Sequence, residues 1–278
     1  MVSQPDRPSG RGRKLTPPAV AAHANEAGLP LFQPETLRSE DAVRRLEAAN
    51  PDLLVVVAYG EILRKSVLQL APGGALNVHP SLLPRYRGAS PIAEAIRNGD
   101  SQTGVSIIKL VRRLDAGPVV AQATVDLHGT ETTGSLSQRL ANLAAEMLPD
   151  VCDAWIAGAL EPIEQDESAA TYTHEWSKRD AEIDWNQSAE VIERLIRAAI
   201  PWPVAWTSFD VQRLQIRSAR VVAGQAGAPG EITSTGNRVL VATGRDSLEL
   251  LSVQPEGKRE MPASGWWTRT CRFHRVSV

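Results

Sequence analysis

The sequence contains only two cysteines, Cys152 and Cys271, which lie far apart and follow no metal-ligand spacing. This scarcity argues against a disulfide framework and against a structural zinc site. The five histidines are also scattered without ligand spacing, so we expect no metal. No apolar run approaches the ~18 residues that a membrane helix needs, and the opening MVSQPDRPSGRGRK lacks the apolar segment of a signal peptide. We therefore expect a cytoplasmic protein with no membrane partner.

The sequence also lacks an excess of either charge. It has 30 Lys and Arg residues against 32 Asp and Glu residues, a formal net charge of -2. The total charge therefore does not predict a nucleic-acid partner, although a local cluster still can. With 278 residues, of which 42% are hydrophobic, the chain can form one large domain or two of common size.

Apolar and helical segments alternate in the first part of the chain, which predicts an α/β fold. The run DLLVVVAYG predicts a strand at Leu53–Val57, buried on both faces as in a parallel sheet covered by helices. In SPIAEAIRNG, Ser90 is expected to cap a helix and Gly99 to end it. A longer apolar stripe from Leu136 to Trp155 predicts another helix, which Pro149 should kink or break. Further predicted segments are helices at Ala19–Ala27 and Ser39–Ala49 and strands at Ala75–Val78 and Val105–Leu110.

The second part of the chain has a different pattern. A polar stretch without periodicity precedes a predicted helix at Ser188–Ala199, and short alternating segments punctuated by turns follow it. This pattern is typical of a small antiparallel barrel or sandwich. The predicted strands are Leu214–Val222, Val239–Ala242 and Leu248–Val253. The predicted division is a first domain at 1–160, a linker at 161–177 and a β domain at 178–278.

Two polar residues end the predicted strand in GALNVHPSLLPRYRG. Asn77 and His79 are two residues apart, so they point to the same face of the strand. In an open α/β sheet ligands bind at the carboxyl ends of strands, where a hydrogen-bond donor beside a group titrating near pH 7 suits catalysis. By itself the pair is equally compatible with an Asn and a His that only satisfy loop backbone.

A stiff loop and a carboxylate accompany this pair. Pro80 and Pro84 restrict the following loop, which can present backbone groups to a flat ligand. In KLVRRLDAGPVV, Asp115 follows another predicted strand, in a turn that can bring it towards His79. Such an Asp-Ala-Gly is ordinarily only a turn, so its interest depends on these partners.

Together these motifs resemble a known family. NVHPSLLPRYRG, followed by LDAGPVVAQ, is similar to the signature of the folate-dependent formyltransferases, and the similarity extends from Gln4 through PWP at Pro201–Pro203 to LLSVQPEGKREM. The resemblance implies a Rossmann-like, mostly parallel catalytic domain followed by a small OB-like barrel, and 10-formyltetrahydrofolate as formyl donor without a metal. It implies a catalytic triad of Asn77, His79 and Asp115 and a folate-contacting loop of Ser81, Leu82, Leu83 and Pro84.

Members of this family formylate a glycinamide ribonucleotide, a sugar nucleotide or methionyl-initiator tRNA. The opening QPDRPSGRGRKLTPPAV is similar to the loop by which the tRNA-dependent members enter the acceptor arm. The resemblance therefore implies initiator methionyl-tRNA as the partner of a monomeric enzyme of translation initiation, contacted by Arg7, Arg11, Arg13 and Lys14 of a mobile basic finger. Charge alone favours a merely solvated basic terminus. A sugar-nucleotide amine as acceptor, and a protein that binds tRNA or folate without catalysis, remain alternatives.

The implied β domain carries its own basic residues and a tryptophan pair. Lys258, Arg259, Arg269, Arg272 and Arg275 could meet phosphates. The pair Trp266 and Trp267 either stacks on a base or packs on the barrel, and packing is favoured.

The family ordinarily begins with a strand, a turn, a helix and a second strand, roughly 30 residues, before the basic loop. This sequence begins at or just before that loop. We therefore expect Leu53–Val57 to expose an unpaired apolar edge. Two explanations remain open, namely a start site placed too late and a shortened, inactive descendant.

Overall fold

The structure is a computed structural model that describes residues 1–9, 12–210, 212–224 and 227–270. Its contacts divide the chain into two compact units. The first contains residues 1–79, 106–122 and 147–165, and the second contains residues 80–105, 123–146 and those from 166 onward. No helix in the described ranges is long and apolar enough to cross a membrane.

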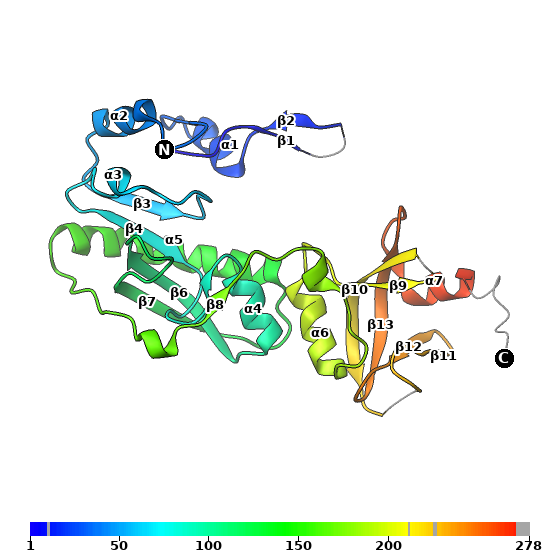
Figure 1. Cartoon of the computed structure of the whole chain (residues 1–278). Helices are drawn as coiled ribbons and strands as arrows, with labels where there is room; N and C mark the ends of the chain where they lie inside the picture. Colours follow the sequence, from blue (N-terminus) through cyan, green and yellow to red (C-terminus); the bar gives the residue numbers. More distant parts are fainter. Residues whose placement is uncertain (10–11, 211, 225–226, 271–278) are drawn as a thin grey trace. The chain divides into compact units, whose positions relative to one another are not determined.

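The first unit starts with a β-hairpin and continues through helices to two neighbouring strands (Figure 1). The Ser39 hydroxyl accepts a hydrogen bond of 3.2 Å from the Ala42 N–H, which caps the second helix as its sequence predicts. Leu46 and Val67 belong to the apolar core that joins this helix to the next. The elements are β1 (Arg7–Ser9), β2 (Lys14–Thr16), α1 (Ala19–Glu26), α2 (Glu40–Ala48), β3 (Leu54–Val57), α3 (Lys65–Leu68) and β4 (Ala75–His79).

The central sheet has four strands in the order β3-β4-β6-β7, where β6 is Gln102–Lys109 and β7 is Val119–Asp126. Strands β3 and β4 are parallel, whereas β4 and β6 are antiparallel, with His79 opposite Ser106. The α/β prediction is confirmed, but the sheet is mixed rather than mostly parallel. The reason is that an apolar run marks a strand without encoding its direction.

Strand β3 is less buried than its sequence predicts. Val55 and Val57 are 42% and 58% exposed, whereas we predicted burial on both faces. Within the described residues β3 pairs with β4 alone. One face of this apolar strand is therefore open to solvent, as expected for a segment at the edge of a sheet.

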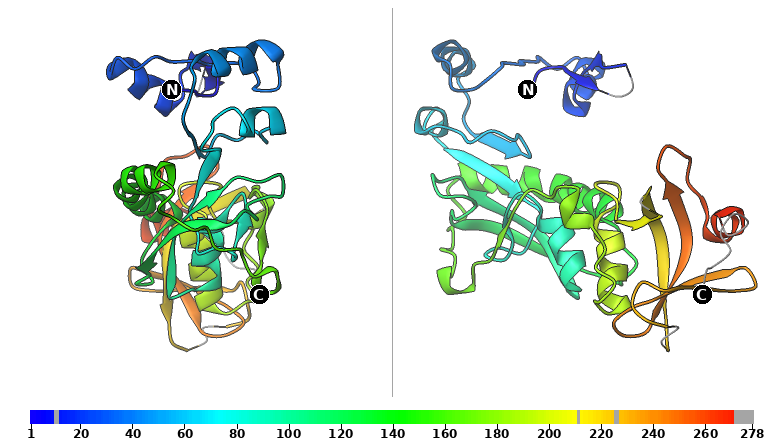
Figure 2. Two further views of the ribbon diagram at one scale, coloured as in Figure 1. Left: turned by 90° about the vertical axis from the view of Figure 1, so that its left-hand side faces the viewer. Right: turned by 45° about the vertical axis from the view of Figure 1, so that its right-hand side comes forward.

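The second unit combines helices with a six-stranded antiparallel sheet (Figure 2). Its main path is β11-β12-β13-β10-β9, and β14 pairs with β13. Its helices and short strands are β5 (Arg87–Gly88), α4 (Pro91–Asn98), β8 (Tyr172–Thr173), α6 (Ala189–Ala198) and α7 (Ala263–Thr270), with single 3-10 turns at Glu167–Ala169 and Arg179–Ala181. The sheet strands are β9 (Trp206–Phe209), β10 (Gln212–Val222), β11 (Ile232–Thr235), β12 (Arg238–Ala242), β13 (Ser247–Pro255) and β14 (Met261–Pro262).

The antiparallel β domain was predicted correctly, but the described strands do not close into a barrel. Strands β9 and β11 lie at opposite ends of the path and are only four residues long. Helix α7 packs against β12, β13 and β14. A helix rather than a further strand thus covers part of this sheet.

Helix α5 (Thr133–Ile156) has residues in both units and continues through Pro149, so the predicted break does not occur. Leu136 and Leu140 of the apolar stripe are buried, and Met147 and Val151 on either side of Pro149 are half-buried. The packing of this stripe can outweigh the one backbone hydrogen bond that a proline removes.

The predicted helix caps agree with the structure except at one residue. Ser188 accepts a 3.4 Å hydrogen bond from the Val191 N–H and caps α6, and Gly99 ends α4 with a φ of 72°. Ser90 does not cap α4, because its hydroxyl accepts from the Trp176 N–H at 3.3 Å.

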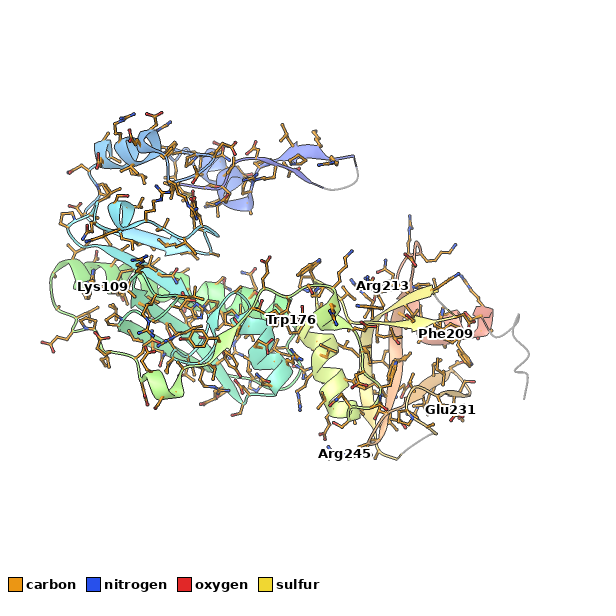
Figure 3. The ribbon with its side chains drawn as sticks, viewed as in Figure 1. Lys109, Trp176, Phe209, Arg213, Glu231 and Arg245 are labelled. Carbon is orange, nitrogen blue, oxygen red and sulfur yellow. The ribbon has the colours of Figure 1, made fainter. Side chains whose placement is uncertain are left out.

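The tryptophan pair in α7 belongs to an aromatic cluster. Trp266 is 6% exposed and meets Phe209, labelled in Figure 3, edge-on with 5.1 Å between ring centroids. Trp267 lies 5.8 Å from Trp266 and is half-buried. The packing alternative is therefore confirmed for Trp266.

Candidate active site

Strand β4 places Asn77 and His79 side by side on one face of the sheet. In the pairing register Asn77 lies between Val56 of β3 and Ile108 of β6. His79 follows two residues later, opposite Ser106, and is 4% exposed, whereas Asn77 is half-buried. The arrangement gives one strand end both an amide donor and an imidazole.

The turn after β6 brings Asp115 to this histidine. Its carboxylate Oδ2 lies 3.6 Å from His79 Nδ1, and the two side chains are 12% and 5% exposed. The separation is in the range of an ion pair and slightly longer than a hydrogen bond. Asp115 adopts a φ of 46°, in the left-handed region that non-glycine residues seldom enter. A carboxylate beside an imidazole can orient the ring and stabilise its protonated form.

Sequence patterns missed two further polar residues, namely Ser106, which lies opposite His79 in the sheet, and Gln122, which bonds Ser106. Ser106 faces His79 across the antiparallel pair, and its hydroxyl accepts a 2.8 Å hydrogen bond from Gln122 Nε2 of β7. Ser106 is fully buried. Both strands contain other polar residues as well, so Ser106 and Gln122 gave no distinct sequence signal, and only the register of the sheet brings them together.

The loop that follows His79 in the chain is rigid and largely buried. Ser81 is fully buried, and its hydroxyl donates to the Arg85 carbonyl at 2.7 Å. Leu83 is also buried and is joined to Pro84 by a cis peptide bond, whereas Leu82 and Pro84 are half-buried. The structure thus gives the predicted folate loop a fixed backbone.

Arg87 anchors the end of this loop inside the second unit. Its guanidinium is fully buried and bonds the Glu167 carboxylate at 3.0 Å and the Tyr172 hydroxyl at 3.1 Å. The hydrogen bond that Arg87 donates to the Glu167 carboxylate is the main cause that raises the pKa of Arg87, so the buried group stays charged. This contact fixes the loop against residues 167–172.

The basic segment near the N-terminus forms the β1-β2 hairpin. Arg7 pairs with Thr16 and Ser9 pairs with Lys14, so Arg7 and Lys14 share one face of the hairpin. Arg13 lies in the connecting turn, and all three basic side chains are exposed. Arg11 lies outside the described residues.

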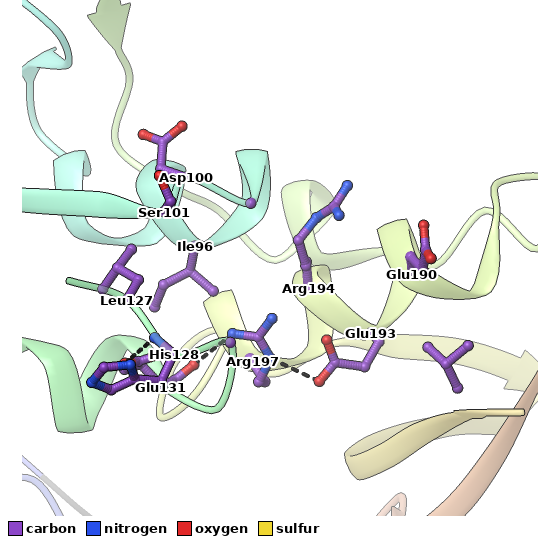
Figure 4. A pocket seen from close by; sticks show the side chains of 13 residues that line it. Ile96, Asp100, Ser101, Leu127, His128, Glu131, Glu190, Glu193, Arg194 and Arg197 are labelled. Carbon is purple, nitrogen blue, oxygen red and sulfur yellow. Dashed lines mark hydrogen bonds and ion pairs between the residues drawn. The ribbon is translucent and has the colours of Figure 1, made fainter.

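The second unit contains a cavity of about 400 Å³ that includes none of the predicted site residues (Figure 4). Arg197 bonds Glu193 at 2.7 Å and also donates to the Glu131 carbonyl oxygen. Burial alone would raise the pKa of Glu131, but hydrogen bonds from backbone N–H groups, that of His128 foremost, lower it overall. Arg197 and Glu193 pair with each other and backbone N–H groups bond the Glu131 carboxylate, so the cavity resembles a stabilised junction of helices rather than the predicted site.

The described residues contain no cluster of His, Cys, Asp or Glu arranged to hold a metal ion. Cys152 is a half-buried free thiol, and burial raises its pKa. Cys271 lies outside the described residues.

Comparison with known families accounts for most of the chain. A family model described as "Formyl transferase" matches residues 1–152, and one described as "Formyl transferase, C-terminal domain" matches residues 176–270. The chain belongs to the formyl transferase family. Among curated relatives, the methionyl-tRNA formyltransferase of Chloroflexus aggregans is 48% identical over 96% of this formyl transferase and 87% of its own length. The methionyl-tRNA formyltransferase of Methylococcus capsulatus is 46% identical over 95% of this formyl transferase and 86% of its own length.

Solved structures show the same fold at much lower identity. HypX from Aquifex aeolicus in complex with tetrahydrofolic acid matches 90% of this formyl transferase and 44% of its own chain, with a TM-score of 0.67 and 17% identity. An N-formyltransferase from Helicobacter canadensis, in complex with folinic acid and dTDP-3-aminofucose, matches 89% of this formyl transferase and 87% of its own chain. Its TM-score is 0.63 and its identity is 13%.

Proposed function

We propose that this formyl transferase moves a formyl group from 10-formyltetrahydrofolate to the amino group of methionyl-initiator tRNA, in the cytoplasm and as a monomer. The acceptor is supported by relatives of 46–48% identity that carry the name methionyl-tRNA formyltransferase. The chemistry is supported above all by the distance of 3.6 Å between Asp115 Oδ2 and His79 Nδ1. His79 lies on β4, the strand that also carries Asn77. The sugar N-formyltransferases are far less similar, at 13–20% identity.

The residues present fit an acyl transfer from a neutral donor. The formyl group on the folate supplies an electrophilic carbonyl carbon when it is bound. Asn77 is an amide donor and His79 can accept or donate a proton, so the pair matches the needs of a carbonyl that gains negative charge. The loop of Ser81, Leu82, Leu83 and Pro84 is proposed to contact the folate, and the hydrogen bond from the Ser81 hydroxyl to the Arg85 carbonyl, which holds this loop, supports that role.

The proposed mechanism gives each residue one task. Asn77 donates a hydrogen bond to the carbonyl oxygen as negative charge develops on it. His79 takes the proton that the attacking amine loses and returns it to the nitrogen that leaves. Asp115 keeps the imidazole in the orientation and protonation state that this transfer requires. Each proton removed from the amine thus ends on the leaving nitrogen, and none is consumed.

The tRNA contacts are proposed for the basic hairpin. Arg7, Arg13 and Lys14 are exposed, and Arg11 continues the same basic segment. Guanidinium and ammonium groups of this kind neutralise phosphates and release counterions. We also propose a catalytic region at 1–160, a connecting segment at 161–177 and a C-terminal region at 178–278, which the two family matches support.

Formyl transfer to charged initiator tRNA tests the proposal directly. We expect Asn77→Ala to lower turnover by about 10² to 10³, because one oxyanion donor is lost. The matched control is Asn142→Ala on the surface of α5, which should retain full turnover. Near-complete activity of Asn77→Ala would remove Asn77 from the mechanism.

The same assay separates the alternatives. Transfer to a sugar-nucleotide amine but not to methionyl-tRNA would replace the proposed acceptor. Binding of tRNA or folate without any transfer would identify a protein that binds but does not catalyse.

A further inference from the structure

The backbone around Asp115 requires support from elsewhere in the fold. A non-glycine residue at a φ of 46° is in an unfavourable conformation, which persists only where the surrounding structure holds it there. Two residues later the chain at Gly117 touches β6 so closely that a Cβ would lie 1.8 Å from the Lys109 carbonyl oxygen. The direction of the Asp115 side chain therefore depends on what fixes this turn.

One side chain bridges the turn from a distant part of the sequence. Gln165 Nε2 donates hydrogen bonds to the Asp115 carbonyl oxygen at 2.8 Å and to the Gly117 carbonyl oxygen at 2.7 Å. An amide nitrogen carries two hydrogens, so both are used on this turn. The two accepting carbonyls belong to the peptide groups that join Asp115 to Ala116 and Gly117 to Pro118, and a single amide therefore fixes both peptide planes.

The segment that carries Gln165 is itself fixed beside the turn. Ile163 and Val119 form an antiparallel bridge with two backbone hydrogen bonds, of 2.7 and 2.8 Å. Val119 opens β7, four residues after Asp115. A stretch that its polar sequence identifies only as linker thus runs along the turn and presents Gln165 to it.

We propose that Gln165 is a positioning residue that directs the Asp115 carboxylate towards His79. This inference rests on the proposed function, because it assigns a role within the same site. Gln165 donates to two backbone carbonyls of the turn. It acts by fixing the peptide planes that set where the Asp115 side chain points, which keeps Oδ2 at 3.6 Å from His79 Nδ1.

The main test is Gln165→Leu, which keeps the approximate size of the side chain and removes both donors. We expect kcat to fall between about tenfold and a hundredfold, with KM for methionyl-tRNA changed less than about twofold, since the misplaced group acts on the chemical step. Gln138→Leu is the matched control, because it also removes an amide that makes a hydrogen bond, on the exposed face of α5. Gln138→Leu should retain the kcat of the unchanged protein and its KM for methionyl-tRNA.

A double-mutant cycle separates positioning from general stability. If Gln165 works through Asp115, Gln165→Leu should change kcat by less than about twofold in an Asp115→Asn background. A purely structural role predicts the same loss in both backgrounds, and that result would overturn the inference. Should Gln165→Leu fail to fold, Gln165→Asn retains the amide with a shorter reach, and a smaller loss of kcat is expected.

Crystal structures of the unchanged protein and Gln165→Leu provide a readout that does not depend on activity. We expect the Asp115–His79 separation to increase in the variant, and an unchanged separation would contradict the inference. Absence of transfer by the unchanged protein would instead contradict the proposed function, and the structures would still decide the role of Gln165.

Discussion

Among the glycines in the described part of the chain, Gly117 is the one where an added Cβ would lie nearest to another atom. A Cβ at this position would lie 1.8 Å from the Lys109 carbonyl oxygen and 3.0 Å from its carbon. Lys109 cannot easily withdraw, because its own N–H donates to the Pro118 carbonyl at 3.0 Å. We predict that Gly117→Ala lowers the free energy of unfolding by about 1–3 kcal/mol, as overpacking of a tight contact does, and that it lowers kcat because the Asp115 turn shifts. Denaturant unfolding and the formyl-transfer assay measure the two effects.

Gly265→Ala is the control for this change. No atom lies within 4 Å of the Cβ it would add, and Gly265 is in helix α7. Alanine is favoured over glycine in a helix by roughly 0.5–1 kcal/mol, so this variant should be unchanged or slightly more stable. Equal stability and activity of the two variants would show that the turn does not press against β6.

The residues of the candidate active site show how much of a site the sequence alone can predict. Asn77 and His79 share a face because the side-chain period of a strand is two, which sequence alone provides. The approach of Asp115 was expected from a turn signal. Ser106, Gln122 and Gln165 were not predicted, because their contacts depend on sheet register and on chain segments up to 50 residues away. Local patterns carry no information about such partners.

At the scale of elements, the N-terminal hairpin differs most from its prediction. The sequence predicted a mobile basic finger but no strands there, whereas β1 and β2 form a three-residue antiparallel ladder despite the prolines and glycines around them; the mobility of the finger stays a prediction. Strand β7 was also missed, although its alternating apolar and polar residues are themselves typical of a half-buried strand. Helices with a serine at the N-terminus, α2 and α6, were predicted to within about a residue, since a cap marks their first turn.

The hairpin leads to a prediction about salt dependence. Arg7 and Lys14 lie on one face, so both can meet the same stretch of phosphates. We expect Arg7→Ala with Lys14→Ala to weaken tRNA binding at low salt and to reduce the slope of log affinity against log salt by about one per lost contact. Titrations of initiator tRNA at several salt concentrations measure both quantities.

Lys65→Ala is the control for charge, because Lys65 is exposed on α3 and lies outside the hairpin. It should leave the slope unchanged. If the hairpin variant and the unchanged protein had the same slope, Arg7 and Lys14 would not contact phosphate.

At the scale of the whole molecule, an exposed apolar strand coincides with a weak net charge. Val55 and Val57 project from β3 with 42% and 58% of their surface exposed, and β3 has one strand neighbour in the described part of the chain. The formal charge is -2 and the isoelectric point is about 6.2, so copies of the chain repel one another little near that pH. An unpaired apolar strand edge is a template for pairing with a second copy.

We therefore predict weak self-association at high concentration, strongest near pH 6.2, through β3. Val57→Lys should reduce light scattering at that pH, because a lysine on an edge strand opposes pairing between copies. Val20→Lys is the control, since Val20 is 51% exposed on helix α1 and the change adds the same charge without touching a strand. A reduction by Val57→Lys alone assigns the association to the strand edge. Equal reductions would assign it to net charge, and no scattering in the unchanged protein would contradict the prediction.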